Sequence, residues 1–214
     1  MKNSRYIWGA LAAAAVVAGC AGTGSTQDLD AEFAAMMQSS FRDEGIATSD
    51  RLQQDLGQAA CSSPTAPPPE VAKRIESEAM ASIKWPTGGQ YLGDWKAGEQ
   101  LAQSGRGMTW SDASPATSGN GGQCYNCHQI DKKEISFGTI GPSLYNYGKI
   151  RGVKDVAAPE SAAIVQYTWG KLWNSKAYSA CSNMPRFGHM KLLDEHQIRD
   201  LMALLLDPRS PVNQ

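Results

Sequence analysis

The chain has 214 residues, 42% of them hydrophobic, which allows one or two ordinary folded domains. Its 21 glycines and 11 prolines predict many turns and long irregular connections. With 20 basic and 21 acidic side chains, a formal net charge of −1 and no dense basic stripe, the sequence argues against nucleic acid as a partner.

Residues 1–19 have the three parts of a secretion signal: a basic start with Lys2 and Arg5, an apolar run from residue 7 to 17, and small residues. The run is too short to span a bilayer permanently. It closes in VAGC at residues 17–20, which resembles the lipobox of bacterial lipoproteins. We therefore expect Cys20 to be acylated and to anchor the mature chain. The alternative is ordinary cleavage nearby, with Cys20 lost or spare.

Removal of this signal leaves 18 basic and 21 acidic side chains, a net charge of −3. Ala21, in place of Asp, resembles lipoproteins that are released to the outer membrane. The expected location is therefore the periplasm, with attachment to a membrane, favouring the outer one, by the lipid anchor alone. Residues 20–28 are small and polar and are predicted to form a tether.

Residues 29–90 are predicted to form a helical N-terminal extension. Apolar residues at helical spacing indicate a helix over about 29–41 with Phe33, Met36, Met37 and Phe41, and a weaker one over 52–59. Both stripes are interpreted as packing faces. A proline-rich linker at 62–69 precedes another helix over 71–83. The extension carries no motif of its own, which favours a docking surface or a cover for the rest of the chain.

Residues 91–214 are predicted to form the second domain. Asp94 can cap a helix over 94–103, and a Gly/Ser-rich loop without periodicity follows to residue 123. Near the C-terminus, Asp194 and Gln197 form a capping-box pattern before apolar residues at helical spacing up to residue 205. No alternating strands and no internal repeat are present, so the predicted fold class is mainly α.

The chemistry is indicated by CYNCH at residues 124–128. One helical turn would present Cys124, Cys127 and His128 on one face, which is the geometry that covalent haem attachment requires: two thiols for the vinyl groups and an imidazole for the iron. A zinc half-site lacks a second Cys/His pair, and a redox dithiol lacks a βαβ pattern. Because only one such motif is present, one haem c is expected.

The opposite iron ligand should come from a downstream loop, and soft thioether or imidazole donors are usual. Met184, within NMPRFG at residues 183–188, is the first candidate. His189 and Met190 are the main alternatives, Met108 is a weaker one, and Met202 lies on an apolar helical face that indicates core. A Met/His pair would leave no open position for substrate, which favours an electron carrier over a catalyst.

Two cysteines remain in an oxidising compartment, Cys61 and Cys181, and we expect a disulfide between them. The bridge would tie the extension to the loop that carries Met184. The alternatives are a redox-active or haem-ligating Cys181, free thiols, or pairing with another chain.

The order of a capped helix, CYNCH, IGPSL at 140–144, NMPRFG and an amphipathic helix resembles class I cytochromes c over residues 91–206. This resemblance implies that the Pro142 carbonyl accepts a hydrogen bond from the haem histidine. A plain Gly-Pro turn is the alternative.

More narrowly, the chain resembles the SoxX family, in IGPSL, in NMPRFG and in the ending LDPRSPVN at 206–213. The resemblance implies the electron-accepting, non-catalytic subunit of a SoxAX heterodimer, which oxidatively joins thiosulfate to a cysteine of the SoxYZ carrier, an L-cysteine S-thiosulfotransferase reaction. Its partners would be a SoxA-like cytochrome, the SoxYZ carrier and a soluble cytochrome c acceptor.

Two other functions stay open. The chain would otherwise be a generic periplasmic lipoprotein cytochrome that serves an oxidase or dehydrogenase, or a self-sufficient haem enzyme. Its long extension and lipobox depart from a minimal SoxX chain, which leaves the variant of the complex, and any further small subunit, open.

Overall fold

The computed structural model describes residues 28–134 and 137–214. The predicted signal peptide, the lipid anchor Cys20 and all but the last residue of the predicted tether lie outside these residues. The described part consists of helices and loops, with one isolated antiparallel bridge between Glu44 and Ala47 and no strand. The described residues fall into two units that divide between residues 42 and 43.

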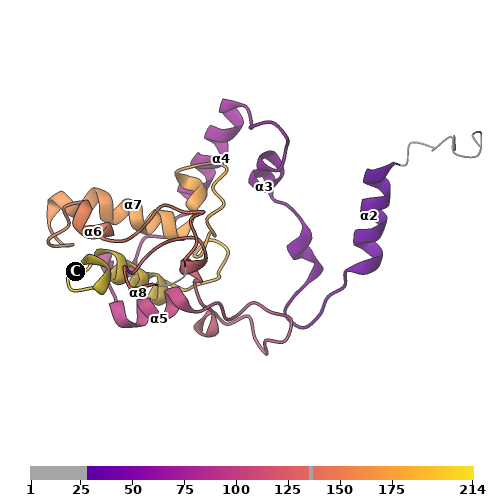
Figure 1. Ribbon diagram of the computed structural model, residues 1–214. Helices are drawn as coiled ribbons and strands as arrows, with labels where there is room; N and C mark the ends of the chain where they lie inside the picture. Colours follow the sequence, from indigo (N-terminus) through magenta and orange to yellow (C-terminus); the bar gives the residue numbers. More distant parts are fainter. Residues whose placement is uncertain (1–27, 135–136) are drawn as a thin grey trace, which may run out of the picture. The chain divides into compact units, whose positions relative to one another are not determined.

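The first unit contains helix α2 (Leu29–Ser40), which is labelled in Figure 1. Asp28 caps it, because the carboxylate accepts a hydrogen bond from the Ala31 amide at 3.1 Å. The predicted helix is present, but no residue of α2 is buried and Phe33 is 58% exposed. The interpretation of its apolar stripe as a packing face stays a prediction, because the described part of this unit holds no second helix for the stripe to pack against.

The second unit holds every other described helix (Figure 1). Its longer α-helices are α4 (Pro69–Ala81), α5 (Trp95–Gln103), α7 (Ala162–Trp173) and α8 (Glu195–Leu206). Its short helices are η1 (Ser49–Leu52), α3 (Leu56–Cys61), η2 (Thr87–Gly89), η3 (Thr117–Gly119), η4 (Cys124–Asn126), α6 (Tyr147–Ile150), η5 (Pro159–Ser161), η6 (Ser175–Ala177) and η7 (Pro211–Asn213).

Helices α5 and α8 pack directly against each other, as the view in Figure 1 suggests. The approach is close because Gly98 faces α8: a Cβ atom there would lie 2.2 Å from the Asp200 carbonyl oxygen. The Asp200 carboxylate in turn accepts a hydrogen bond from the Asp94 amide at 2.8 Å, at the start of α5. A glycine and a buried carboxylate thus fix this crossing.

The capping box predicted for α8 is present. The Asp194 carboxylate accepts a bond from the Gln197 amide nitrogen at 2.9 Å, and the Gln197 side chain accepts one from the Asp194 amide at 3.1 Å. The other Asp194 oxygen accepts a bond from the Thr117 hydroxyl at 3.0 Å, and the Gln197 side chain donates to the Asn120 carbonyl at 3.2 Å. The cap therefore also holds the long loop that leads to CYNCH.

Helix α7 was not expected from the sequence. Its apolar residues do not form one clear stripe, because Val165, Trp169 and Trp173 share the helix with several further buried positions. Trp169 is fully buried, donates a hydrogen bond to the Lys84 carbonyl at 2.8 Å and meets Tyr91 edge-on. The second half of α7 is buried at nearly every position, so it lacks the single apolar stripe by which periodicity identifies a helix.

The second half of the predicted extension packs with the second domain. Ala79 of α4 and Ile83 after it belong to the same buried core cluster as Trp169 and the apolar residues of α8. The compact unit begins at residue 43, so the division of the structure lies well before the predicted boundary at residue 90.

Candidate functional site

A cavity of about 630 Å³ lies in the second unit, and the predicted ligand residues meet around it. Cys124, Cys127, His128, Pro142 and Met184 all contribute to its wall. The remaining wall is largely apolar and comes from α5, α6, α7, α8 and the loops, including Ala102, Ile130, Leu144, Tyr147, Leu172, Phe187, Leu201, Leu204 and Leu205. An apolar chamber with two thiols, one imidazole and one thioether suits a flat, hydrophobic iron macrocycle.

Cys124 begins a turn of 3₁₀-helix, η4, in place of the predicted α-helical turn. The Cys127 and His128 amides both donate to the Cys124 carbonyl, at 3.1 and 3.0 Å. Residues three apart overlie one another in a 3₁₀-helix, so both thiols face the same side. Gln123 enters this turn with a left-handed backbone at φ 48°, which redirects the chain into the motif.

The His128 ring is held from the segment that follows the motif. Its Nδ1 atom lies 2.7 Å from the Pro142 carbonyl oxygen. Because a carbonyl only accepts, Nδ1 is the donor, so the neutral ring keeps its lone pair on Nε2, which is the form of histidine that binds a metal. The Gly141 amide donates to the Cys127 carbonyl at 2.7 Å, which lays this segment against the motif.

Gly141 makes the His128 contact sterically feasible. A Cβ atom at this position would lie 2.2 Å from the His128 Cε1 atom, closer than real Cβ contacts. The glycine that precedes Pro142 therefore has a specific task, which a plain Gly-Pro turn would not require.

Met184 is half-buried and is the candidate sixth ligand that lines the cavity. Its carbonyl accepts a hydrogen bond from the Ser175 hydroxyl at 2.6 Å, and its amide donates to the Ser182 hydroxyl at 3.3 Å. Of the alternatives, Met202 is fully buried in the core cluster, as expected for a packing residue. Met190 is 48% exposed and lines a different pocket.

Two cations that sequence reasoning missed line the cavity, Arg151 and Lys171. The Arg151 guanidinium stacks on the Tyr147 ring at 3.8 Å from its centroid and donates to the Tyr147 carbonyl. Lys171 donates to the Ser175 carbonyl at 3.2 Å, and desolvation lowers the pKa of its amine. Both are suited to meet acidic groups of a ligand, although neither belongs to a motif that local spacing would have identified.

Arg186, two residues after Met184, does not line this cavity. It forms an ion pair of 2.6 Å with Asp55, the residue that caps α3. Nearby, Cys61 and Cys181 form a disulfide with their Cα atoms 5.4 Å apart. Cys181 is therefore engaged in this bond and does not face the iron site as a thiolate.

Burial raises the pKa of the Cys124 thiol to about 12. The thiol is therefore neutral at physiological pH, unlike the low-pKa thiolates of redox dithiols. Within residues 28–134 and 137–214 there is also no cluster of three or more His, Cys, Asp or Glu side chains that could hold a metal ion. The raised pKa of the thiol disfavours a redox-dithiol interpretation of the motif.

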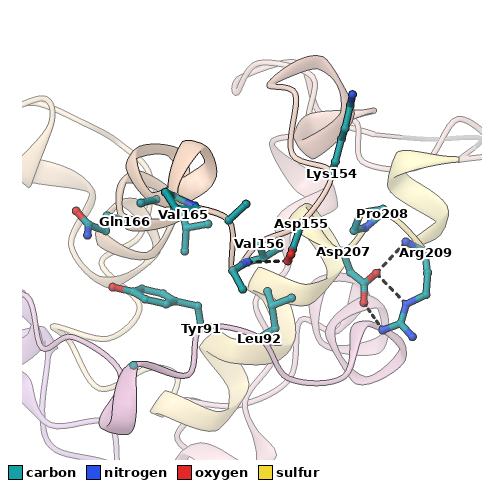
Figure 2. A pocket seen from close by; sticks show the side chains of 15 residues that line it. Tyr91, Leu92, Lys154, Asp155, Val156, Val165, Gln166, Asp207, Pro208 and Arg209 are labelled. Atoms are coloured by element: carbon teal, nitrogen blue, oxygen red, sulfur yellow. Dashed lines mark hydrogen bonds and ion pairs between the residues drawn. The ribbon is translucent and has the colours of Figure 1, made fainter.

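A second pocket of about 610 Å³, shown in Figure 2, lies away from the ligand residues. Tyr91, Val165 and Gln166 line one part of it, and the turn at 154–159 and the tail after α8 line the rest. The Arg209 side chain turns back onto the Asp207 carboxylate at 2.8 Å, as the dashed lines in Figure 2 mark. The pocket wall holds none of the predicted ligands.

Comparison with known proteins bears on the same segment. Residues 120–207, from just before CYNCH to the end of α8, match the family described as Cytochrome c. A protein of Aquifex aeolicus (strain VF5) named as an uncharacterized lipoprotein is 37% identical over 166 residues, which is 75% of this chain and 73% of that protein. In the described ranges, no helix is both long and apolar enough to cross a membrane.

Proposed function

We propose that this chain, which belongs to the cytochrome c family and is related over most of its length to a bacterial lipoprotein, is the electron-accepting SoxX subunit of a thiosulfate-oxidising SoxAX complex. The sequence segments behind the haem motif are the reason for this finer assignment. The family implies covalently bound haem c and electron transfer. The prediction of a mainly α, class I cytochrome c fold is confirmed.

The proposed haem site uses the residues around the cavity. Cys124 and Cys127 would form the thioether bonds, and the His128 Nε2 atom and the Met184 sulfur would take the two axial positions of one haem iron. When bound, the haem supplies an iron that gains or loses one electron. The protein's own groups surround this position with apolar side chains and orient the imidazole through Pro142, and with Met184 bound they would leave no free position for a substrate.

The assignment to the SoxX family rests on one observation, the succession of IGPSL, NMPRFG and LDPRSPVN behind the haem motif. Each of these segments has a defined task in the fold. The ending packs as η7, where Asn213 accepts a hydrogen bond from the Gly148 amide at 2.9 Å and donates to the Leu205 carbonyl at 3.0 Å. It thus joins α6 to the end of α8.

In the proposed reaction, a SoxA-like partner holds the catalytic haem. Joining a carrier thiol to thiosulfate forms one sulfur–sulfur bond and releases one proton and two electrons. This chain would accept those electrons one at a time and pass them to a soluble cytochrome c.

The proposal is tested by reconstitution. The purified chain, a SoxA-like cytochrome and the reduced SoxYZ carrier are mixed with thiosulfate and oxidised cytochrome c, and the mass of the carrier is followed. We expect conjugation that depends on this chain and on reducible haem within it. Turnover that is unchanged when the chain is omitted would contradict the proposal and favour a cytochrome that serves an oxidase or dehydrogenase.

The lipoprotein relative supports a lipid anchor, which we propose is on Cys20, in the periplasm and on the outer membrane. Radiolabelled palmitate should enter the wild-type chain and not Cys20→Ala, and fractionation should move that variant from the membrane to the soluble periplasm. A Cys20→Ala chain that stays in the membrane fraction would contradict the anchor.

A further inference from the structure

The loop that carries Met184 is attached to the N-terminal segment at three points on the two sides of that methionine. Three residues before it, Cys181 is bonded to Cys61 at the end of α3. Two residues after it, Arg186 pairs with Asp55 at the start of α3, at 2.6 Å. The short helix α3 therefore spans the Met184 segment, with one of its ends on each side.

Helix α4 provides the third attachment. The Glu76 carboxylate accepts a hydrogen bond from the Ala180 amide at 3.0 Å. The Ala180 carbonyl accepts one from the Lys176 amine at 2.8 Å, so both backbone polar groups of Ala180 are bonded. Lys176 is 7% and Ala180 6% exposed, so the bond between them is buried, whereas the bond to Glu76 is partly buried.

These three attachments hold the Met184 loop itself, which has little regular structure of its own. Residues 178–186 form no α-helix, and the backbone of Met184 is otherwise held by the hydroxyls of Ser175 and Ser182. A loop with few backbone bonds opens at low free energy unless other groups restrain it. The Arg186 side chain is only 11% exposed, so its pairing with Asp55 is shielded from water more than an ordinary surface ion pair.

We infer that Asp55, Cys61 and Glu76 form a clamp that positions the Met184 sulfur over the iron and sets how readily that ligand is displaced. This inference rests on the proposed role of Met184 as axial ligand. The clamp residues do not line the cavity, so they are positioning residues that act through the loop. The N-terminal segment thereby gains a role in the iron site besides covering the domain.

The test uses the full-length oxidised holoprotein and imidazole, which competes with Met184 for the iron. Binding is followed by loss of the absorbance band that arises from the methionine–iron bond, and Met184→Ala shows whether that band belongs to Met184. We expect Cys61→Ser/Cys181→Ser and Asp55→Asn each to raise the apparent imidazole affinity by about threefold to tenfold. Asparagine remains a good N-cap, so Asp55→Asn removes the ion pair and keeps α3.

The matched control is Glu78→Gln, which removes an exposed ion pair with Arg74 on α4 and should bind imidazole as the wild type does. A double-mutant cycle with Arg186→Gln isolates the pair: Asp55→Asn should have little further effect in that background. Sub-denaturing amounts of urea should barely change the apparent imidazole affinities, because displacement of Met184 opens only the loop and exposes little new surface.

Two outcomes overturn the inference, and they are distinguishable. If the wild type shows the Met184-dependent band but the clamp variants bind imidazole like Glu78→Gln, the clamp is wrong while the ligand assignment stands. If the wild type has no such band, the ligand assignment and the clamp both fail.

Discussion

Gly141 allows the Pro142 carbonyl to reach His128. Replacing it by alanine would place a methyl group 2.2 Å from the imidazole, so the segment and the ring must separate. The hydrogen bond to Nδ1 would lengthen, the imidazole would become a weaker base, and the oxidised iron would be stabilised less.

For Gly141→Ala we therefore expect a higher reduction potential and a free energy of unfolding lower by roughly 1–3 kcal/mol. Redox titration and urea unfolding measure the two quantities. Gly119→Ala is the control, because a Cβ atom there meets nothing within 4 Å. If Gly141→Ala and Gly119→Ala have the same reduction potential and the same free energy of unfolding, the close approach at Gly141 does not influence the haem site.

At this scale, sequence reasoning identified the residues that belong to motifs. Cys124, Cys127 and His128 follow from spacing alone, while Met184 and Pro142 needed the order of motifs and a family resemblance. Arg151 and Lys171 were missed because they reach the cavity only through the fold. Ser175 was missed because only the fold brings its hydroxyl to the Met184 carbonyl. Asp55 was not connected with Arg186, since 131 residues separate the two partners of that pair.

At the scale of elements, the α5–α8 crossing depends on a missing side chain. A methyl group on Gly98 would meet the Asp200 carbonyl oxygen at 2.2 Å and the Leu204 Cβ atom at 3.1 Å. We expect Gly98→Ala to lower the free energy of unfolding by roughly 1–3 kcal/mol, since the helices must move apart. Urea unfolding tests this, and a neutral or stabilising effect would contradict the described crossing.

The cap of α8 gives a second prediction for an element. Asp194→Ala should cost about 1 kcal/mol of unfolding free energy, because the Gln197 amide nitrogen loses its acceptor. It should also loosen the loop before CYNCH, which Thr117 ties to the same carboxylate. Hydrogen exchange should therefore rise around Thr117 as well as in α8. Faster exchange in α8 alone would contradict the second role of the cap.

Helices with a clear start signal and one apolar stripe were predicted well, as α5 and α8 illustrate. Helix α7 was missed because it is buried on several sides and so lacks a stripe. Helix α2 has a capped start and an apolar stripe, and it too was predicted, although the partner of its stripe stays a prediction. Periodicity reports where apolar residues gather, whereas their burial depends on what the rest of the fold offers them.

At the scale of the whole molecule, the Cys61–Cys181 disulfide closes a loop across a sequence separation of 120 residues. Closing so long a loop restricts the unfolded chain, and disulfides contribute about 2–5 kcal/mol. We expect Cys61→Ser/Cys181→Ser to lower the unfolding free energy by an amount in this range. Chemical unfolding of the holoprotein measures it, and a loss well below 1 kcal/mol would show that the bridge restrains only the local loop.

The tail after α8 gives the molecule a pH dependence. The pKa of Asp207 is lowered mainly because its carboxylate accepts hydrogen bonds from the Arg209 side chain. The Arg209 backbone amide also donates to this carboxylate, at 2.8 Å, and lowers the pKa further. A carboxyl whose pKa is lower when folded stabilises the protein above its unfolded pKa of about 4, and this contribution is lost as pH falls through the folded pKa.

Arg209→Gln should therefore reduce stability at pH 7 and make no difference well below pH 4, where Asp207 is protonated in every form. Denaturant unfolding across this range measures the difference, which is small because Arg209 is largely exposed. The control is Arg74→Gln, which also removes one positive charge and one exposed ion pair, that with Glu78, but at a site remote in sequence from Asp207. A difference that persists in acid would assign the effect to packing.

We propose that the CYNCH haem is an electron carrier because Met184 closes the iron. The most direct test of this claim is carbon monoxide binding to the reduced holoprotein, compared between the wild type and Met184→Ala. We expect the wild type to resist carbon monoxide and to show a methionine–iron absorbance band when oxidised, and the variant to lose the band and bind the gas. A wild type that binds carbon monoxide readily, or a variant with an unchanged spectrum, would contradict the claim.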